Sequence, residues 1–239
     1  MISPLVSKLE RRDELSDAER LALANVLDKA RPVAAGETII GEGSRPEHST
    51  FLVSGFVGRV SFVADGGRQI TELNVPGDFI DLHSFLIKEM DHSLVALTDA
   101  LVAPAPHSAL KTITEELPHL TRLLWLETVI DAAVHRQWLV AMGRKEAAPR
   151  LAQLFCEIYL RLEAAGLAAD NAFDLPLTQS DVADILGITT VHVNRSLMSL
   201  RDQNLVEWRR GQVLILDWTG LSGLADFDPT YLRLKKVPV

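Results

Sequence analysis

The residues whose side chains are best suited to specific recognition chemistry lie close together in the C-terminal part of the chain. Arg195 carries a guanidinium whose parallel N–H donors match the O6 and N7 acceptors of guanine, and Asn194 beside it can pair with an adenine or reach a phosphate. Thr190 can meet a thymine methyl group or a polar base edge, whereas Val191 offers only apolar contact. Presented together on one helical face, these four side chains could contact the edges of DNA bases.

The sequence around them predicts two short helices joined by a tight turn. Thr178 is a suitable N-cap for the first helix, Gly187 ends it, and Thr189 can cap the second. The apolar positions of each helix fall on one face, which leaves the four side chains on the outer face of the second helix. This is the pattern of a helix-turn-helix, in which the second helix enters the major groove and the first crosses the phosphates. The residues expected to contact phosphate are Thr178, Gln179, Ser180, Thr189 and His192.

Two β-branched stretches follow at residues 205–208 and 212–218, and they predict a two-stranded wing. Arg209 and Arg210 lie at its turn and are further candidates for phosphate contacts, with a solvated surface turn as the alternative interpretation. The alternative for the two helices is an αα-hairpin in an unrelated helical domain. The exposed Arg195 followed by a wing favours DNA binding.

Composition limits the class of protein. The 239 residues carry 24 Lys+Arg against 32 Asp+Glu, so DNA contact must depend on local placement of arginine and not on overall charge. The chain has no uninterrupted run of about 18 apolar residues and no secretory signal, so we expect a cytoplasmic protein without a membrane partner. No GxxxxGK, GxSxG or HExxH motif is present, so we expect no enzyme.

The N-terminal half has a different periodicity. Residues 4–29 predict one or two short helices, with Ser16 as a cap. From Arg31 to Pro106 the apolar period is two, and six short β-branched runs are separated by Gly, Pro, Asp and Ser. Such a series predicts a barrel or sandwich of the β-roll type, with a hairpin turn at Gly66-Gly67. A short helix is expected at residues 108–116.

A long helix is predicted at residues 118–142, because proline suits a first helical turn and no breaker follows. A hinge is expected at Gly143-Arg144, before another helix at 147–165. The long helix is apolar on two sides, so it needs two partners. We expect one to be the β-roll and the other to be the same helix of a second subunit. The residues expected in that dimer contact are Leu123, Leu126, Ile130 and Ala133.

The fold class predicted from these elements is α+β. We expect a β-roll sensor domain with N-terminal helices at residues 1–117, a dimerisation helix at 118–143 and a winged helix-turn-helix at 144–239. This order resembles the cyclic AMP receptor protein / fumarate-nitrate regulator (Crp/Fnr) superfamily of bacterial transcription factors. The most specific matches are LTQSDVADILGITTVHVNRSL at 177–197, GEGSRPEHSTFLVSGFV at 41–57 and LNVPGDFI at 73–80.

The resemblance implies a homodimer that binds a two-fold symmetric operator in double-stranded DNA, with RNA polymerase as a further partner. It also implies that the state of an effector in the roll is transmitted along the long helix to the DNA-binding domains. Val191 departs from the family pattern, which usually has a glutamate that accepts from a cytosine amino group. We therefore expect a half-site that differs from the common family consensus.

The effector site departs from the family more strongly. Its cyclic-nucleotide binders carry Gly-Glu-Leu after the GDFI stretch and then Arg-Ser/Thr-Ala, whose arginine pairs with the cyclic phosphate. Here these runs are Asp81-Leu82-His83 and His92-Ser93-Leu94. An imidazole replaces a guanidinium poorly, so we expect weak cyclic AMP binding or none. The candidate effector-pocket residues are Asp81, His83, His92, Ser93, His135 and Arg136, the last two being alternatively a polar pair that fixes the register of the dimer seam.

The numbers of cysteines and histidines limit the other cofactors that the resemblance suggests. Its oxygen-sensing branch holds an iron–sulfur cluster with four cysteines, and the single Cys156 excludes such a cluster. For haem, the resemblance leaves His83, His92 or His135 as an axial ligand, with polar lining as the simpler interpretation. We expect no metal site. The alternative function, from another class, is an allosteric sensor of a cyclic nucleotide or haem whose C-terminal domain contacts protein and not DNA.

Overall fold

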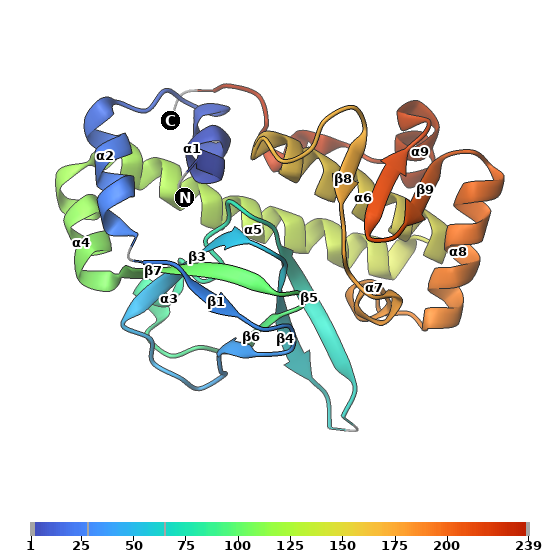
Figure 1. The fold of residues 1–239 in the computed structure, drawn as a ribbon, viewed down its shortest axis with the longest axis horizontal. Helices are drawn as coiled ribbons and strands as arrows, with labels where there is room; N and C mark the ends of the chain where they lie inside the picture. The colour runs from blue at the N-terminus through green and yellow to red at the C-terminus, as the bar shows by residue number, and fades with distance from the viewer. Residues whose placement is uncertain (1–2, 28, 65, 238–239) are drawn as a thin grey trace.

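The computed structural model describes residues 3–27, 29–64 and 66–237, and in these the N-terminal half forms a β-roll of two antiparallel sheets (Figure 1). The strand orders are β1-β7-β3 and β2-β6-β4-β5. The six predicted strands form, and the roll adds β1, whose central Pro32 disfavours a strand, and the short helix α3 (Ser84–Ile87), whose four residues are too few to show a helical period. The strands are β1 (Arg31–Val33), β2 (Thr38–Ile40), β3 (His48–Ser54), β4 (Val57–Phe62), β5 (Arg68–Asn74), β6 (Ser93–Ala96) and β7 (Ala100–Pro106).

Three short helices cover one end of the roll: α1 (Ser3–Glu10), α2 (Asp17–Val26) and α4 (His107–Glu116). The prediction that Ser16 caps α2 is confirmed by a capping box, in which the Glu19 N–H donates to Ser16 Oγ at 3.3 Å and the Ser16 N–H donates to Glu19 Oε2 at 2.8 Å. These helices pack with the first turns of the long helix around Phe51 and Phe79, whose rings meet edge to face.

The long helix α5 (Pro118–Arg144) crosses the molecule from the roll to the C-terminal domain (Figure 1). It includes Gly143 and Arg144, so the predicted hinge position is wrong by two residues. The chain instead turns at Lys145 and Glu146, which are extended, before α6 (Ala147–Ala164) begins. Glycine near a helix end indicates a break only weakly, since it costs a helix only about 1 kcal/mol relative to alanine.

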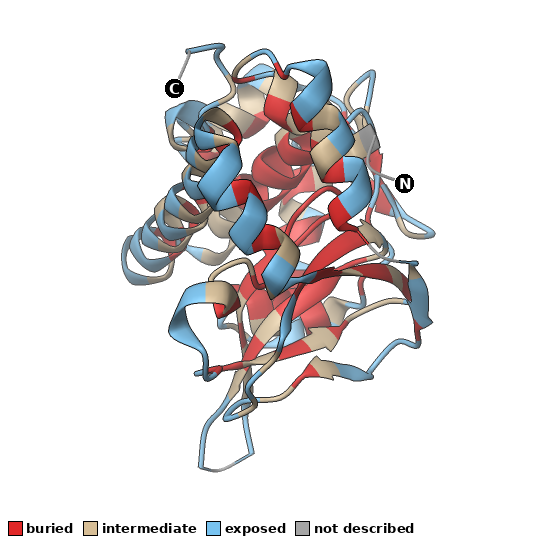
Figure 2. Cartoon of the chain, turned by 90° about the vertical axis from the view of Figure 1, so that its left-hand side faces the viewer, coloured by how far each residue is buried: buried red, intermediate tan, exposed pale blue. Residues whose placement is uncertain are grey.

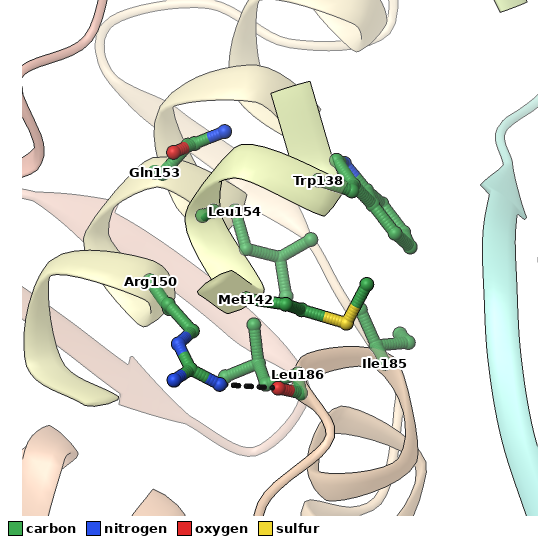
Figure 3. Close-up of a pocket in the computed structure, with 8 residues that line it drawn as sticks. Trp138, Met142, Arg150, Gln153, Leu154, Ile185 and Leu186 are labelled. Carbon is green, nitrogen blue, oxygen red and sulfur yellow. Dashed lines mark hydrogen bonds between the residues drawn. The ribbon is translucent and has the colours of Figure 1, made fainter. Parts of the chain in front are cut away.

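Side chains from three helices fill the joint at this turn. Figure 3 shows Trp138 and Met142 of α5, Leu154 of α6 and Ile185 of α7 (Gln179–Leu186) around a cavity of about 20 Å³. Arg150 donates to the carbonyl of Leu186 at 3.0 Å, the interaction drawn in the figure. The joint is therefore packed, and the C-terminal domain is held against α5.

The C-terminal domain contains the helix-turn-helix α7 and α8 (Thr190–Asp202), with a sheet in the order β8-β10-β9. The two predicted wing strands form, as β9 (Val206–Arg209) and β10 (Gln212–Ile215). The expected polar link contains a third strand, β8 (Ala172–Asp174), whose three residues give too short a pattern to predict. The helix α9 (Trp218–Ala225) and the 3₁₀ turn η1 (Pro229–Leu232) were also missed, because two glycines in α9 disfavour a helix.

One hydrophobic core connects the two halves of the chain. It extends from Phe56 and Ile70 of the roll through Ile130 of α5 to the buried face of the helix-turn-helix. Figure 2 shows this continuity as buried residues through the centre of the molecule, with exposed helix faces outside. No helix among the described residues is long and apolar enough to cross a membrane.

The exposed face of α5 differs from the predicted dimer face. Within one chain Leu123 is fully buried and Ile130 is 6% exposed, whereas Leu126 is half-buried against the core that contains Ile130, so much of the predicted dimer face is covered by the chain itself. Both sides of this helix are apolar, and the sequence does not say which side the roll and α6 cover. The large apolar side chains left exposed on α5 are Trp125, Val129, Leu139 and Val140, while Ala133 is half-buried.

The turn between β3 and β4 gives a test of the roll. Gly55 has φ +86°, and an added Cβ would lie 2.5 Å from the Asp99 carbonyl oxygen, whereas Gly36 has φ +84° with nothing within 4 Å of such a Cβ. Gly36→Ala should lower the free energy of unfolding by about 1 kcal/mol, the cost of left-handed backbone. Gly55→Ala should cost about 2 kcal/mol more, because the clash is with backbone. Urea denaturation measures both, and equal losses would contradict the packing described.

Candidate nucleic-acid interface and sensor site

The helix-turn-helix is built by the predicted caps. Thr178 Oγ1 accepts from the Asp181 N–H at 3.1 Å, and the Thr178 N–H donates to Asp181 Oδ2 at 3.1 Å, which completes a capping box at the start of α7. Gly187 ends α7 in the left-handed region at φ +63°, and Thr189 Oγ1 accepts from the His192 N–H at the start of α8. The local sequence therefore determines how the two helices meet.

The four candidate base-contacting side chains share the exposed face of α8. Thr190, Val191, Asn194 and Arg195 are all exposed, with Val191 at 55%. Within the described part of the chain, Arg195 makes no hydrogen bond or ion pair, so its donors are available to a ligand. Asn194 differs, because its amide is paired with Gln179 of α7. Met198 lies one turn farther along this face at 59% exposure, and the sequence analysis did not include it.

The candidate phosphate-contacting residues gather at the N-termini of α7 and α8. Thr178, Ser180, Thr189 and His192 are exposed there and Gln179 is half-buried, where backbone N–H groups and the helix dipole favour an anion. Thr189 Oγ1 and His192 Nδ1 lie 2.9 Å apart.

The wing turn holds the other two candidates. Arg210 has φ +52° and with Gly211 forms the turn between β9 and β10. Arg209 pairs with Glu207 at 3.2 Å on an exposed surface, so part of its charge is already compensated.

The β-roll contacts the helix-turn-helix directly through β5. Arg68 Nη2 donates to Asp181 Oδ1 and Arg68 Nε donates to Asp184 Oδ2, both at 2.7 Å. The Gln69 side chain donates to the Asp184 carbonyl at 2.6 Å. We call Arg68, Gln69, Asp181 and Asp184 the clamp. Sequence analysis missed it, since its halves are more than 110 positions apart and no local pattern connects them.

Two histidines of the candidate effector pocket come together inside the roll. The rings of His83 and His92 have centroids 5.2 Å apart, and both Nε2 atoms are buried without a hydrogen-bond partner in the described structure. Burial lowers the pKa of His83 to about 4, and the nearby Arg59 acts in the same direction. Burial and Arg59 also lower the pKa of His92, although its Nδ1 lies 2.6 Å from an oxygen of Asp91. Both rings are therefore neutral at pH 7.

Arg59 is the cation of this region, and the sequence analysis did not include it. Its Nη1 lies 2.7 Å from Glu72 Oε2, and both side chains are nearly buried. His135 of α5 lies 3.2 Å from the same carboxylate oxygen. The long helix thus contacts the roll through Glu72, and the guanidinium is already neutralised within the chain.

The other candidate pocket residues lie elsewhere. Asp81 is buried and accepts from the Thr50 N–H at 2.5 Å, and the Ser93 hydroxyl accepts from the Glu42 N–H at 3.1 Å. Arg136 does not lie with the histidines, because it lines a groove of about 340 Å³ between α5 and the C-terminal segment. The structure therefore brings His83, His92 and His135 near Arg59 and separates Arg136 from them.

The described residues contain no group of three or more His, Cys, Asp or Glu side chains placed to hold a metal ion. Cys156 is fully buried, and burial raises the pKa of its thiol to about 12. A single buried thiol does not fit the four-cysteine iron–sulfur cluster of the family.

Comparison with known proteins agrees with this architecture. A model of the cyclic nucleotide-binding domain matches residues 30–116, and a model of the Crp-like helix-turn-helix domain matches residues 149–224. A probable transcriptional activator from Rhizobium leguminosarum bv. viciae is 30% identical over 171 residues, which are 72% of this chain and 70% of that protein. The transcriptional activator protein FnrL from Cereibacter sphaeroides is 29% identical over 210 residues, 86% of this chain and 84% of that protein.

Among solved structures, that of FixK2 from Bradyrhizobium japonicum is similar with a TM-score of 0.74 and 26% identity, covering 82% of this chain and 96% of that one. A roll that matches the cyclic nucleotide-binding domain model, joined to a Crp-like helix-turn-helix, is the architecture of a DNA-binding transcription regulator, a class distinct from enzymes. The chain belongs to the Crp/Fnr family, whose regulators bind DNA, typically as dimers. The predicted family and α+β fold class are confirmed.

Asp81 predicts a pH dependence of stability. Burial raises the pKa of its carboxyl to about 7, against the opposing effect of the Thr50 and Ser84 donors. The folded state then holds a proton that the unfolded state releases near pH 4, so stability falls as pH rises between these values. From pH 5 to pH 8 this loss should be about 2 to 3 kcal/mol, and Asp81→Asn should remove it. Chemical denaturation at the two pH values measures the loss, with the exposed Asp202→Asn as control; an unchanged pH slope in Asp81→Asn would contradict it.

Proposed function

We propose that this chain is a homodimeric, sequence-specific transcription regulator that acts in the cytoplasm on a two-fold symmetric operator, with RNA polymerase as a further partner. We divide it into a sensor roll at 1–117, a dimerisation helix at 118–143 and a DNA-binding domain at 144–239. The observation that carries the proposal is the exposed face of α8, where Arg195 has free donors beside two capped helix N-termini. Guanidinium donors on such a face suit guanine, and the N-termini suit phosphates.

The valine at position 191 favours an operator whose half-site differs from the common family consensus. Its side chain is 55% exposed at the start of α8 and cannot accept a hydrogen bond from a cytosine amino group. It can pack against a thymine methyl group instead. The half-site we propose contains a guanine that Arg195 contacts and, at the position facing Val191, a base that offers an apolar contact.

Replacing Arg195 tests the proposed base contact. Arg195→Ala should lower operator affinity by about 1 to 3 kcal/mol per half-site and reduce discrimination at the guanine, because a bidentate contact is lost. Fluorescence polarisation on operators selected from genomic DNA measures both quantities. Arg45→Ala, which removes an exposed arginine of the roll, controls for the change in charge. Equal affinity of Arg195→Ala and the parent protein would rule out the assignment.

The proposed dimer uses the exposed face of α5. Trp125, Val129, Ala132, Arg136 and Leu139 are spaced alternately by four and three residues, which is the spacing of a coiled-coil seam. Trp125 and Leu139 are each 68% exposed, so one chain leaves large apolar side chains uncovered at both ends of this stripe. A second copy of the helix is the partner that such a repeat fits.

Charges on this stripe should therefore separate the subunits. Trp125→Glu with Leu139→Glu should weaken dimerisation at least about 100-fold, since each lost apolar contact is worth about 1.5 to 3 kcal/mol. Sedimentation velocity over a concentration series measures the association. Leu21→Glu alters a leucine on α2 that is 61% exposed and should leave the dimer unchanged. A double variant that dimerises like the parent would place the interface elsewhere.

We also propose that the roll has lost tight cyclic AMP binding. The position of the phosphate-binding arginine is His92, whose ring is neutral, and the nearby Arg59 is paired with Glu72. A cyclic phosphate would meet an uncharged imidazole and a carboxylate in place of a free guanidinium. Titration calorimetry should show no micromolar affinity for cyclic AMP, and micromolar binding would overturn the proposal.

The clamp supports a direct route from sensor to DNA reader. Arg68 contacts Asp181, the partner of the N-cap Thr178 in the capping box of α7, so displacement of β5 acts on the helix N-terminus proposed to contact phosphate. This route is additional to the long helix, which contacts the roll through His135 and Glu72.

A further inference from the structure

The side chains of Gln179 and Asn194 form a reciprocal amide pair between the two helices of the helix-turn-helix. Gln179 Nε2 donates to Asn194 Oδ1 at 3.2 Å, and Asn194 Nδ2 donates to Gln179 Oε1 at 2.7 Å. Gln179 is the first residue of α7, and Asn194 lies in the second turn of α8. The pair therefore closes a ring of two hydrogen bonds between the start of one helix and the exposed face of the other.

The geometry of an amide limits what Asn194 can do while this ring is closed. A primary amide has one edge on which its oxygen and an N–H lie side by side, and bidentate pairing with adenine uses that edge. In Asn194 the same edge is occupied by Gln179. One N–H remains on each side chain, and a single donor of this kind can reach a phosphate oxygen but does not identify a base.

We propose that Asn194 is a positioning residue that holds Gln179 on the phosphate backbone, and that it does not read a base. This inference rests on the proposed DNA-binding function and refines it. The free N–H of Gln179 lies at an N-terminus that already favours an anion, and the ring fixes its direction before DNA arrives. Base discrimination then belongs to Arg195, Val191 and Thr190, for which the described structure gives no competing side-chain partner.

The test uses the full-length protein, a selected operator and a panel of operators with single base-pair changes. Asn194→Ala and Gln179→Ala should each weaken binding about tenfold, by the same factor on every operator of the panel. The double variant should be no weaker than either single variant, because both remove the same ring. The slope of affinity against salt should stay unchanged, since a neutral amide releases no counterion.

Rescue and a matched control sharpen the outcome. The exchanged pair Gln179→Asn with Asn194→Gln keeps both amides and the total length of the two side chains, and it should restore most of the affinity. Arg195→Ala is the contrasting control, with a loss that depends on the operator base. If Asn194→Ala loses affinity at one base pair only and Gln179→Ala does not, Asn194 reads a base and the proposal is overturned.

A measurement without DNA separates this proposal from the proposed function. In the free protein, Asn194→Ala should shift the side-chain NH₂ resonance of Gln179 in a ¹⁵N correlation spectrum, and Gln179→Ala should shift that of Asn194. Absence of both shifts overturns the pair whatever the DNA result. A parent protein that shows the shifts but has no site-selective, salt-sensitive DNA binding contradicts the proposed function, and with it the DNA-reading part of this inference.

Discussion

The arrangement of the domains depends on one buried charge, the guanidinium of Arg161. It lies 2.7 Å from Asp78 Oδ2 and donates to the Leu73 carbonyl at 2.9 Å, so α6 is bound to the roll. Its other neighbour, Glu157, accepts from the indole of Trp138 and from the Tyr231 hydroxyl, which connects α5 and the C-terminal segment. A buried charge that loses a partner costs about 3 to 5 kcal/mol. This penalty opposes separation of the roll, the long helix and the DNA-binding domain.

The clamp is a second junction, at the other end of the same interface. Arg161 of α6 binds Asp78 of the roll, whereas Arg68 of the roll binds the capped end of α7. Between the Arg161 and Arg68 contacts lie α5 and the packed joint beside Lys145, so the roll and the C-terminal domain have little freedom to move independently. A displacement of β5 therefore acts on α7 directly and does not depend on the turn at Lys145 and Glu146. In this fold the roll and the helix-turn-helix contact each other directly, and the long helix is one of several connections between them.

Local parts of the site could be predicted and long-range parts could not. Thr178, Gly187 and Thr189 act on neighbours within four positions, so their caps follow from the sequence. The partners of Arg68 on α7 and those of Arg161 on the roll lie more than 80 positions away, and nothing in the local sequence of either arginine indicates these contacts. Which face of α5 is covered within one chain depends on distant contacts for a related reason, since Leu123 and Trp125 are both apolar and only the position of the roll decides which is covered.

By itself, the sequence determined the elements and the family: periodicity, caps and turn residues act over a few positions and specify a β-roll, a long helix and a winged helix-turn-helix. The sequence also shows which side chains of the family pattern are replaced. Histidine stands at position 92 where the family's cyclic-nucleotide binders have an arginine, and valine stands at position 191 where the family usually has a glutamate. Only the tertiary structure decided that Arg59 is neutralised by Glu72 and that Asn194 is engaged by Gln179. Whether a polar side chain is free or occupied depends on distant partners, which the fold brings within hydrogen-bonding distance.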